Sequence, residues 1–175
     1  NDYALLLVGG GYVSMVNGSM PLATIVSGPG NSIDGVGNFQ GPIMLQDSST
    51  SLTMGLNGLI FTNITLAGGT ISLTSDMYLA NNVVIADSGT VNLQNRNIVF
   101  GSNSSTWNGN INWYGNGGTI DMYANVDLTG TWTINGIVEI KGRNHTVHLG
   151  DTAEIIVASG STLELGGVIL DAAWG

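Results

Sequence analysis

Short stretches of alternating apolar and polar residues recur along most of the chain, for example at residues 70–73, 90–93 and 161–165. Gly, Asn, Asp or Ser interrupts each stretch after four or five positions. A period of two is typical of strands with one buried face. No segment keeps apolar residues at i, i+3, i+4 and i+7 for three turns, and the 27 Gly residues disfavour helices. The pattern predicts an all-β protein with almost no helix.

A spaced motif predicts the architecture. Gly-Gly-Thr-Ile at residues 68–71 and 117–120 and Gly-Gly-Val-Ile at 166–169 lie 49 residues apart both times. About six short strands fall within this distance, so three strands take about 24 residues, the size of one coil of a parallel β-helix. We therefore predict a single-domain parallel β-helix (β-solenoid) with about 24-residue coils and a 49-residue double-coil repeat. An antiparallel sandwich is the alternative, and it would not require a fixed spacing.

The repeat also predicts boundaries and ladders. We expect repeats at about residues 42–67, 68–116 and 117–165, with the next copy starting at 166–175. Ile71, Ile120 and Ile169 should share one inward ladder, because equivalent positions of stacked coils lie above one another. Residues 1–41 are rich in Gly, and we expect an irregular N-terminal cap or a strand donated elsewhere. The 19 Asn residues suit left-handed corners and side-chain amide ladders.

Charge narrows the range of partners. Twelve acidic residues stand against Arg96, Lys141 and Arg143, giving a net charge of -9. Nucleic acid and anionic membrane surfaces require clustered basic residues, so we expect neither as a partner. No apolar run approaches about 20 residues, which argues against a membrane-inserted helix. The absence of Cys, an Asn- and Thr-rich surface and a start without Met favour a processed, secreted or cell-surface protein.

The ends of the predicted stack are candidate contact surfaces. Stacked coils leave an apolar, hydrogen-bonding edge at each end, and a solitary solenoid needs caps there. The last copy contains only ten residues, 166–175. Within it, Asp171 stands at a position where the earlier copies have an apolar residue that is expected to point inward. We expect end-to-end contact between copies through Tyr3, Leu5, Leu7, Ile169, Asp171 and Trp174.

The Gly-Gly-Thr-Ile and Gly-Gly-Val-Ile motifs and Phe100-Gly101-Ser102-Asn103 resemble the repeats of bacterial β-helical surface proteins. These include autotransporter passengers, filamentous adhesins and polymorphic outer-membrane proteins with GGA[I/L/V] and FxxN repeats. Here the third motif position is Thr or Val, and the FxxN motif occurs once. The resemblance implies a surface-displayed β-helix that serves in adhesion or as a fibre.

Few side chains look reactive. One polar cluster contains Glu139, Lys141, Arg143, His145 and His148, and we interpret it as a solvated salt pair with corner residues. A β-helical polysaccharide lyase or glycosidase would place carboxylates along an outer groove. The candidate members of such a groove are Asp76, Asp121, Asp127 and Glu139. The residues 34–38 are interpreted as a Gly turn rather than a calcium loop. We predict no catalytic residue, metal site or cofactor.

Aromatic residues gather between residues 107 and 132. Trp113 and Tyr114 are adjacent, so one of them should face outward, where it could contact a glycan. Core or subunit interface is the favoured interpretation, and Trp132 aligns with an inward position. A Thr-x-Thr-x-Thr run at residues 129–133 is typical of an ice-binding face, but the other segments do not repeat it.

Together these features predict a non-enzymatic structural subunit of an extracellular or cell-surface fibre that polymerises end to end with copies of itself. The alternative is an adhesin or glycan-binding fragment of a longer β-helical surface protein, with host-surface or matrix glycans as its partners. A β-helical polysaccharide lyase or glycosidase is the third hypothesis.

Overall fold

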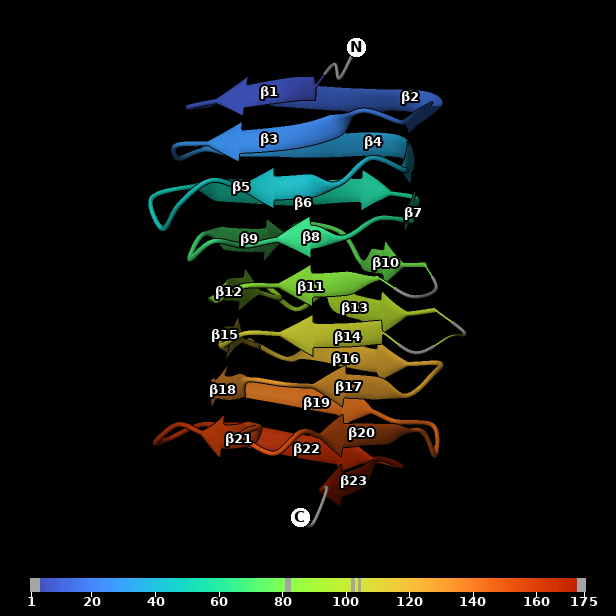
Figure 1. Cartoon of the computed structure of the whole chain (residues 1–175), viewed down its shortest axis with the longest axis vertical. Coiled ribbons are helices and arrows are strands. Elements are labelled where there is room, and N and C mark those ends of the chain that lie inside the picture. Colours follow the sequence, from blue (N-terminus) through green and yellow to red (C-terminus); the bar gives the residue numbers. More distant parts are fainter. Residues whose placement is uncertain (1–3, 81–82, 102, 104, 173–175) are drawn as a thin grey trace.

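The computed structural model describes residues 4–80, 83–101, 103 and 105–172. These residues form a parallel β-solenoid of about 8 turns, with about 21 residues per turn and no helix (Figure 1). The two ends of the described chain lie at opposite ends of the stack (Figure 1). The predicted all-β parallel β-helix is confirmed.

Each turn has three sides, which we call faces A, B and C. Face A is a sheet of its own, made of β1 (Ala4–Val8), β3 (Ala23–Ser27), β5 (Ile43–Leu45), β8 (Ile64–Thr65), β11 (Val84–Ala86), β14 (Ser105–Asn108), β17 (Val126–Leu128), β20 (Thr146–Leu149) and β23 (Ile169–Ala172).

Faces B and C belong to one sheet that divides at β4. Face B comprises β6 (Ser51–Asn57), β9 (Thr70–Leu73), β12 (Gly89–Asn92), β15 (Ile111–Tyr114), β18 (Thr131–Asn135) and β21 (Glu154–Val157). Face C comprises β7 (Leu59–Ile60), β10 (Met77–Leu79), β13 (Asn97–Phe100), β16 (Gly118–Met122), β19 (Ile137–Lys141) and β22 (Thr162–Gly166). In the first two turns, β2 (Tyr12–Met20) and β4 (Asn31–Phe39) each span both faces.

The predicted coil length is wrong, because each turn takes only about 21 residues. This spacing is seen where Ile43 pairs with Ile64 and Ile64 with Ile85. The three Gly-Gly motifs therefore do not stack in one ladder: Ile71 lies on face B, Ile120 on face C and Ile169 on face A. Successive motifs are separated by two turns and one further side, so each motif lies on the next side of the solenoid. The motifs look alike because the three sides share a similar pattern of strands and corners.

The N-terminal segment is regular rather than irregular. Of residues 1–41, the described part forms β1 to β4, which stack in parallel as the first coils. Its first two Gly clusters, at residues 9–11 and 28–30, lie between strands, and Gly9, Gly10, Gly28 and Gly30 have positive φ. Left-handed backbone favours Gly, so the sequence signal for irregularity marks corners of the solenoid.

Inward residues of all three faces form one continuous core. Its widest side chains lie together in the middle of the stack, where Trp107, Trp113 and Trp132 are fully buried. Their ring centroids are 5.0 to 5.9 Å apart, and Phe100 packs edge-on against Trp107. Such tilted and edge-to-face contacts stabilise aromatic pairs. The predicted core position of Trp132 is confirmed.

Asn has two structural uses at the corners. Asn95, Asn116 and Asn144 adopt positive φ, as predicted. Other Asn side chains bind the next coil: the Oδ1 atom accepts a backbone N–H one turn further along, at 2.9 to 3.0 Å, in the pairs Asn38–Leu59, Asn63–Val84, Asn110–Thr131 and Asn125–Thr146. These bonds continue the inter-coil ladder where the backbone leaves the sheets.

Candidate functional site

The C-terminal end of the stack exposes core positions. Val157, Leu165 and Leu170 are 45%, 47% and 46% exposed. Their register partners in the coil above are Ile134, Ile140 and Val147, all fully buried. We call these three exposed residues and the lower edges of β21, β22 and β23 the open end. No strand of the described chain pairs with these edges, so apolar surface and free backbone groups occur together, a combination that favours strand addition.

The N-terminal end is better covered. Leu5 and Leu7 point inward, because their partners Thr24 and Val26 are buried, and Leu7 is only 4% exposed. Met15 of β2 is 8% exposed. Among residues 4–172, leaving aside the gaps named above, no strand pairs with the outer edges of β1 and β2. This end thus offers free backbone groups with less exposed core.

The residues predicted for end contact are only partly placed as expected. Tyr3 and Trp174 lie outside the described residues. Ile169 is 51% exposed but points outward, because it pairs with Thr146 and its neighbour Leu170 pairs with buried Val147. Asp171 likewise faces outward rather than replacing an inward residue. The predicted inward residue, Ile169, stands one position before the residue that points inward, Leu170. A shift of one residue along a strand moves every side chain to the opposite side of the sheet.

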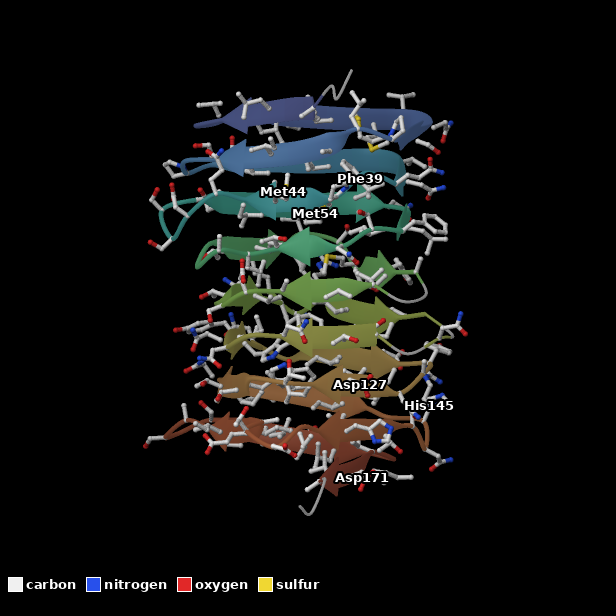
Figure 2. The ribbon with its side chains drawn as sticks, in the orientation of Figure 1. Phe39, Met44, Met54, Asp127, His145 and Asp171 are labelled. Atoms are coloured by element: carbon white, nitrogen blue, oxygen red, sulfur yellow. The ribbon has the colours of Figure 1, made fainter. Side chains whose placement is uncertain are left out.

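Asp171 belongs to a polar row on face A near the open end. It pairs in register with His148, and its Oδ2 atom lies 3.2 Å from His148 Nδ1. Asp127 is the register partner of His148 on the preceding coil, and Figure 2 shows it on the same side as Asp171. The Nε2 atom of His148 lies 3.5 Å from the Asn125 amide nitrogen. The row leaves His148 between two carboxylate-bearing strands.

A second polar cluster lies on face C and in the corner that follows. Arg143 donates two hydrogen bonds to the Asp121 carboxylate, at 2.7 and 2.9 Å, and its guanidinium lies 4.3 Å from the Tyr123 ring centroid. The hydrogen bond to Asp121 raises the pKa of Arg143 above its ordinary value. Lys141 forms the predicted outward salt bridge with Glu139, at 3.3 Å. Both cations are therefore neutralised by neighbouring carboxylates.

The four carboxylates considered for a catalytic groove do not lie on one face of the solenoid. Asp76, Asp121 and Glu139 belong to face C or its corners, whereas Asp127 lies on face A. Asp76 accepts hydrogen bonds from the backbone and side-chain nitrogens of Asn97, at 2.9 and 3.1 Å. Its carboxylate thus serves the same inter-coil role as the corner Asn residues.

No group of three or more His, Cys, Asp or Glu side chains in the described part of the chain could hold a metal ion. The residues 34–38 form part of strand β4 rather than a turn. Within this strand, Asp34 accepts a hydrogen bond from the Tyr12 hydroxyl at 2.9 Å. The carboxylate considered for a calcium loop is therefore bound to a neighbouring strand.

Of the two aromatic residues considered for glycan contact, one faces outward, as predicted. Trp113 is fully buried, so it cannot contact a glycan. Tyr114 is 46% exposed on face B. Tyr114 lies among Ser, Thr and Asn side chains that come from five successive coils of face B. These residues are far apart in the sequence, so only the register of the coils shows that they form a row.

The fold and the open end define the chain as a parallel β-solenoid with an apolar end surface. No family model, curated protein or solved structure matches the chain. Among the described residues there is also no helix long and apolar enough to cross a membrane.

Proposed function

We propose that this chain is a structural subunit of an extracellular or cell-surface fibre, extended by end-to-end stacking of its own copies. The observation that carries the proposal is the contrast between Val157, Leu165 and Leu170 and their fully buried partners one coil above. One further coil would bury these side chains and pair the free strand edges, as each earlier coil does.

The geometry of the two ends is compatible with a second copy as that coil. Every described strand pair is parallel, so an added strand must run in the same direction as the strand above it. A head-to-tail copy meets this requirement. The contact uses different surfaces on the two copies, and such heterologous contacts extend into filaments unless the rotation closes a ring.

The number of strands on each face determines the register of the contact. Face A has nine strands, whereas faces B and C have eight layers each, counting β2 and β4 in both. A copy that continues the solenoid therefore begins on face B, with its β1 beneath β21 and its β2 beneath β22 and β23. The lengths are similar: β1 has five residues and β21 four, while β2 has nine residues, as many as β22 and β23 together without the corner between them. Successive copies would be rotated by one face.

Sedimentation velocity of the full chain and of Leu165→Asp tests this proposal. The wild-type chain should form large species whose fraction grows with concentration. Leu165→Asp should remain monomeric, because burying an unpaired carboxylate against the next coil is strongly unfavourable. Circular dichroism should show the same β-structure in both proteins.

Leu59→Asp is the matched control. Leu59 is 41% exposed on face C, where β7 has a coil on either side, so this variant receives the same charge on a similarly exposed site away from the ends. It should assemble like the wild type. A wild-type chain that stays monomeric at every concentration, or a Leu165→Asp variant that assembles normally, would refute the proposal.

A further inference from the structure

Face B carries two outward columns of hydrogen-bonding side chains. The register aligns five successive coils, from β6 through β9, β12 and β15 to β18. The last four of these strands lie one above another at the left of Figure 1. The first column consists of Ser51, Thr70, Thr90, Asn112 and Thr133, and the second of Thr53, Ser72, Asn92, Tyr114 and Asn135.

These five strands contain no charged residue, although the chain as a whole carries a net charge of -9. Most of their outward groups are also free to bind a ligand. Within the described part of the chain, no side-chain hydrogen bond occupies Thr53, Thr70, Ser72, Thr90, Asn112, Tyr114 or Thr133, whereas Ser51 and Asn135 bind backbone groups.

Tyr114 is the one aromatic side chain in the two columns. It is 46% exposed, and its register partners on the coils above and below are Asn92 and Asn135. The Oδ1 atom of Asn92 is buried and has no hydrogen-bond partner among the described residues. The exposed Tyr114 ring can stack against an apolar face, and Asn112, which is exposed on the same strand, can bind polar groups beside it.

From these observations we propose that face B binds an uncharged polysaccharide, with the glycan chain lying along the stack axis across Tyr114. A sugar ring presents an apolar face to the tyrosine and hydroxyl groups to the Thr and Asn side chains. Coils of a β-solenoid repeat about every 4.8 Å, which is comparable with the length of one pyranose unit in an extended chain. Anionic polysaccharides would be repelled by the net charge of the protein.

The test is co-sedimentation of the full chain with two insoluble neutral probes, cellulose and β-1,3-glucan, compared with retardation by soluble polygalacturonate. We expect saturable binding to at least one neutral probe and none to polygalacturonate. Tyr114→Ala should weaken that binding about tenfold, as expected for loss of one aromatic stacking contact. Asn112→Asp keeps the side-chain size but removes the amide donors, and it should also weaken binding.

Tyr78→Ala is the control, because Tyr78 is 38% exposed on β10 of face C. It should leave the affinity unchanged within about twofold. Absence of binding to both neutral probes, preference for polygalacturonate, or full binding by Tyr114→Ala would overturn the proposal. Arrest of ice growth without polysaccharide binding would overturn it too, and would assign the hydroxyl columns to ice. Because Tyr114 lies on a middle coil rather than at either end, the same comparison made with Leu165→Asp chains, which should remain monomeric, separates glycan binding from end-to-end stacking.

Discussion

At the scale of single residues, polar side chains join coils where the backbone ladder is interrupted. Asn31 is the most enclosed example, since it is fully buried. Its Oδ1 atom accepts the Gly11 N–H at 3.0 Å, and its Nδ2 donates to the carbonyls of Ser27, Gly28 and Ser51 at 3.1, 2.8 and 3.4 Å. One side chain thus connects three successive coils, which explains how an amide is accommodated at an inward position.

We predict that Asn31→Ala lowers the free energy of unfolding by about 2–3 kcal/mol, because it leaves backbone groups at this corner unpaired. Urea unfolding followed by circular dichroism measures the change. Asn112→Ala is the control: Asn112 is exposed and its side chain forms no hydrogen bond within the described chain, so its loss should cost less than about 0.5 kcal/mol. Equal effects of the two substitutions would contradict the role assigned to Asn31.

Asp47 gives a prediction about pH. The Ser49 hydroxyl donates a hydrogen bond to its carboxylate at 2.6 Å and lowers the pKa of Asp47 below its ordinary value, with further help from the Ser49 N–H and the Thr50 hydroxyl. A lowered pKa stabilises the fold above the ordinary carboxyl value, and this contribution is lost as the pH falls through the folded value. NMR titration should therefore give a midpoint below that of an ordinary aspartate, and the midpoint should rise in Ser49→Ala. An unchanged midpoint in Ser49→Ala would contradict this assignment.

At the scale of the strands, close stacking restricts residue size at a few corners. A Cβ atom added at Gly58 would overlap the Gly37 carbonyl oxygen of the preceding coil. We predict that Gly58→Ala destabilises the fold by about 3 kcal/mol or more, because backbone must move to accommodate the methyl group.

Gly18→Ala provides the comparison for Gly58→Ala in thermal or urea unfolding. Nothing lies within 4 Å of a Cβ atom at Gly18, and its φ is not positive. This substitution should change stability by less than about 0.5 kcal/mol. If both substitutions are tolerated equally, the coils approach each other less closely than the structure shows.

The alternation within β15 gives another prediction. Trp113 is fully buried in the aromatic cluster, whereas Tyr114 is outward and half-exposed. Trp113→Ala should cost about 3–5 kcal/mol through lost packing and the resulting cavity. Tyr114→Ala should change the free energy of unfolding by about 0.5 kcal/mol or less. Comparable losses in urea unfolding would show that the strand does not alternate as described.

Strand alternation could be predicted from sequence because it depends on neighbouring residues. Val138 and Ile140 point inward and Glu139 and Lys141 outward, as expected where apolar and polar residues alternate. The ladders could not be predicted, since all three sides of a turn have similar patterns. The motif containing Ile71 therefore matched the motif containing residue 120, although the two lie on different faces. The neutral columns of face B depend on the same register, so they could not be recognised before the coils were aligned.

At the scale of the whole molecule, the two ends determine how copies would assemble. If copies stack end to end as proposed, eight turns and one further side require each copy to be rotated by one face relative to the one before it. In such a fibre, the core and the backbone ladders would continue from one copy into the next. The neutral columns of face B would then shift to the next side of the fibre at each junction.

Electron cryo-microscopy of the wild-type chain with helical reconstruction tests end-to-end assembly most directly. At a coil spacing of about 4.8 Å, the chain should form filaments with a rise of about 40 Å per subunit. Each subunit should be rotated by about one third of a turn relative to the last, because the solenoid has three faces. Dispersed short rods, or filaments whose neighbouring subunits are related by a two-fold axis, would contradict end-to-end stacking.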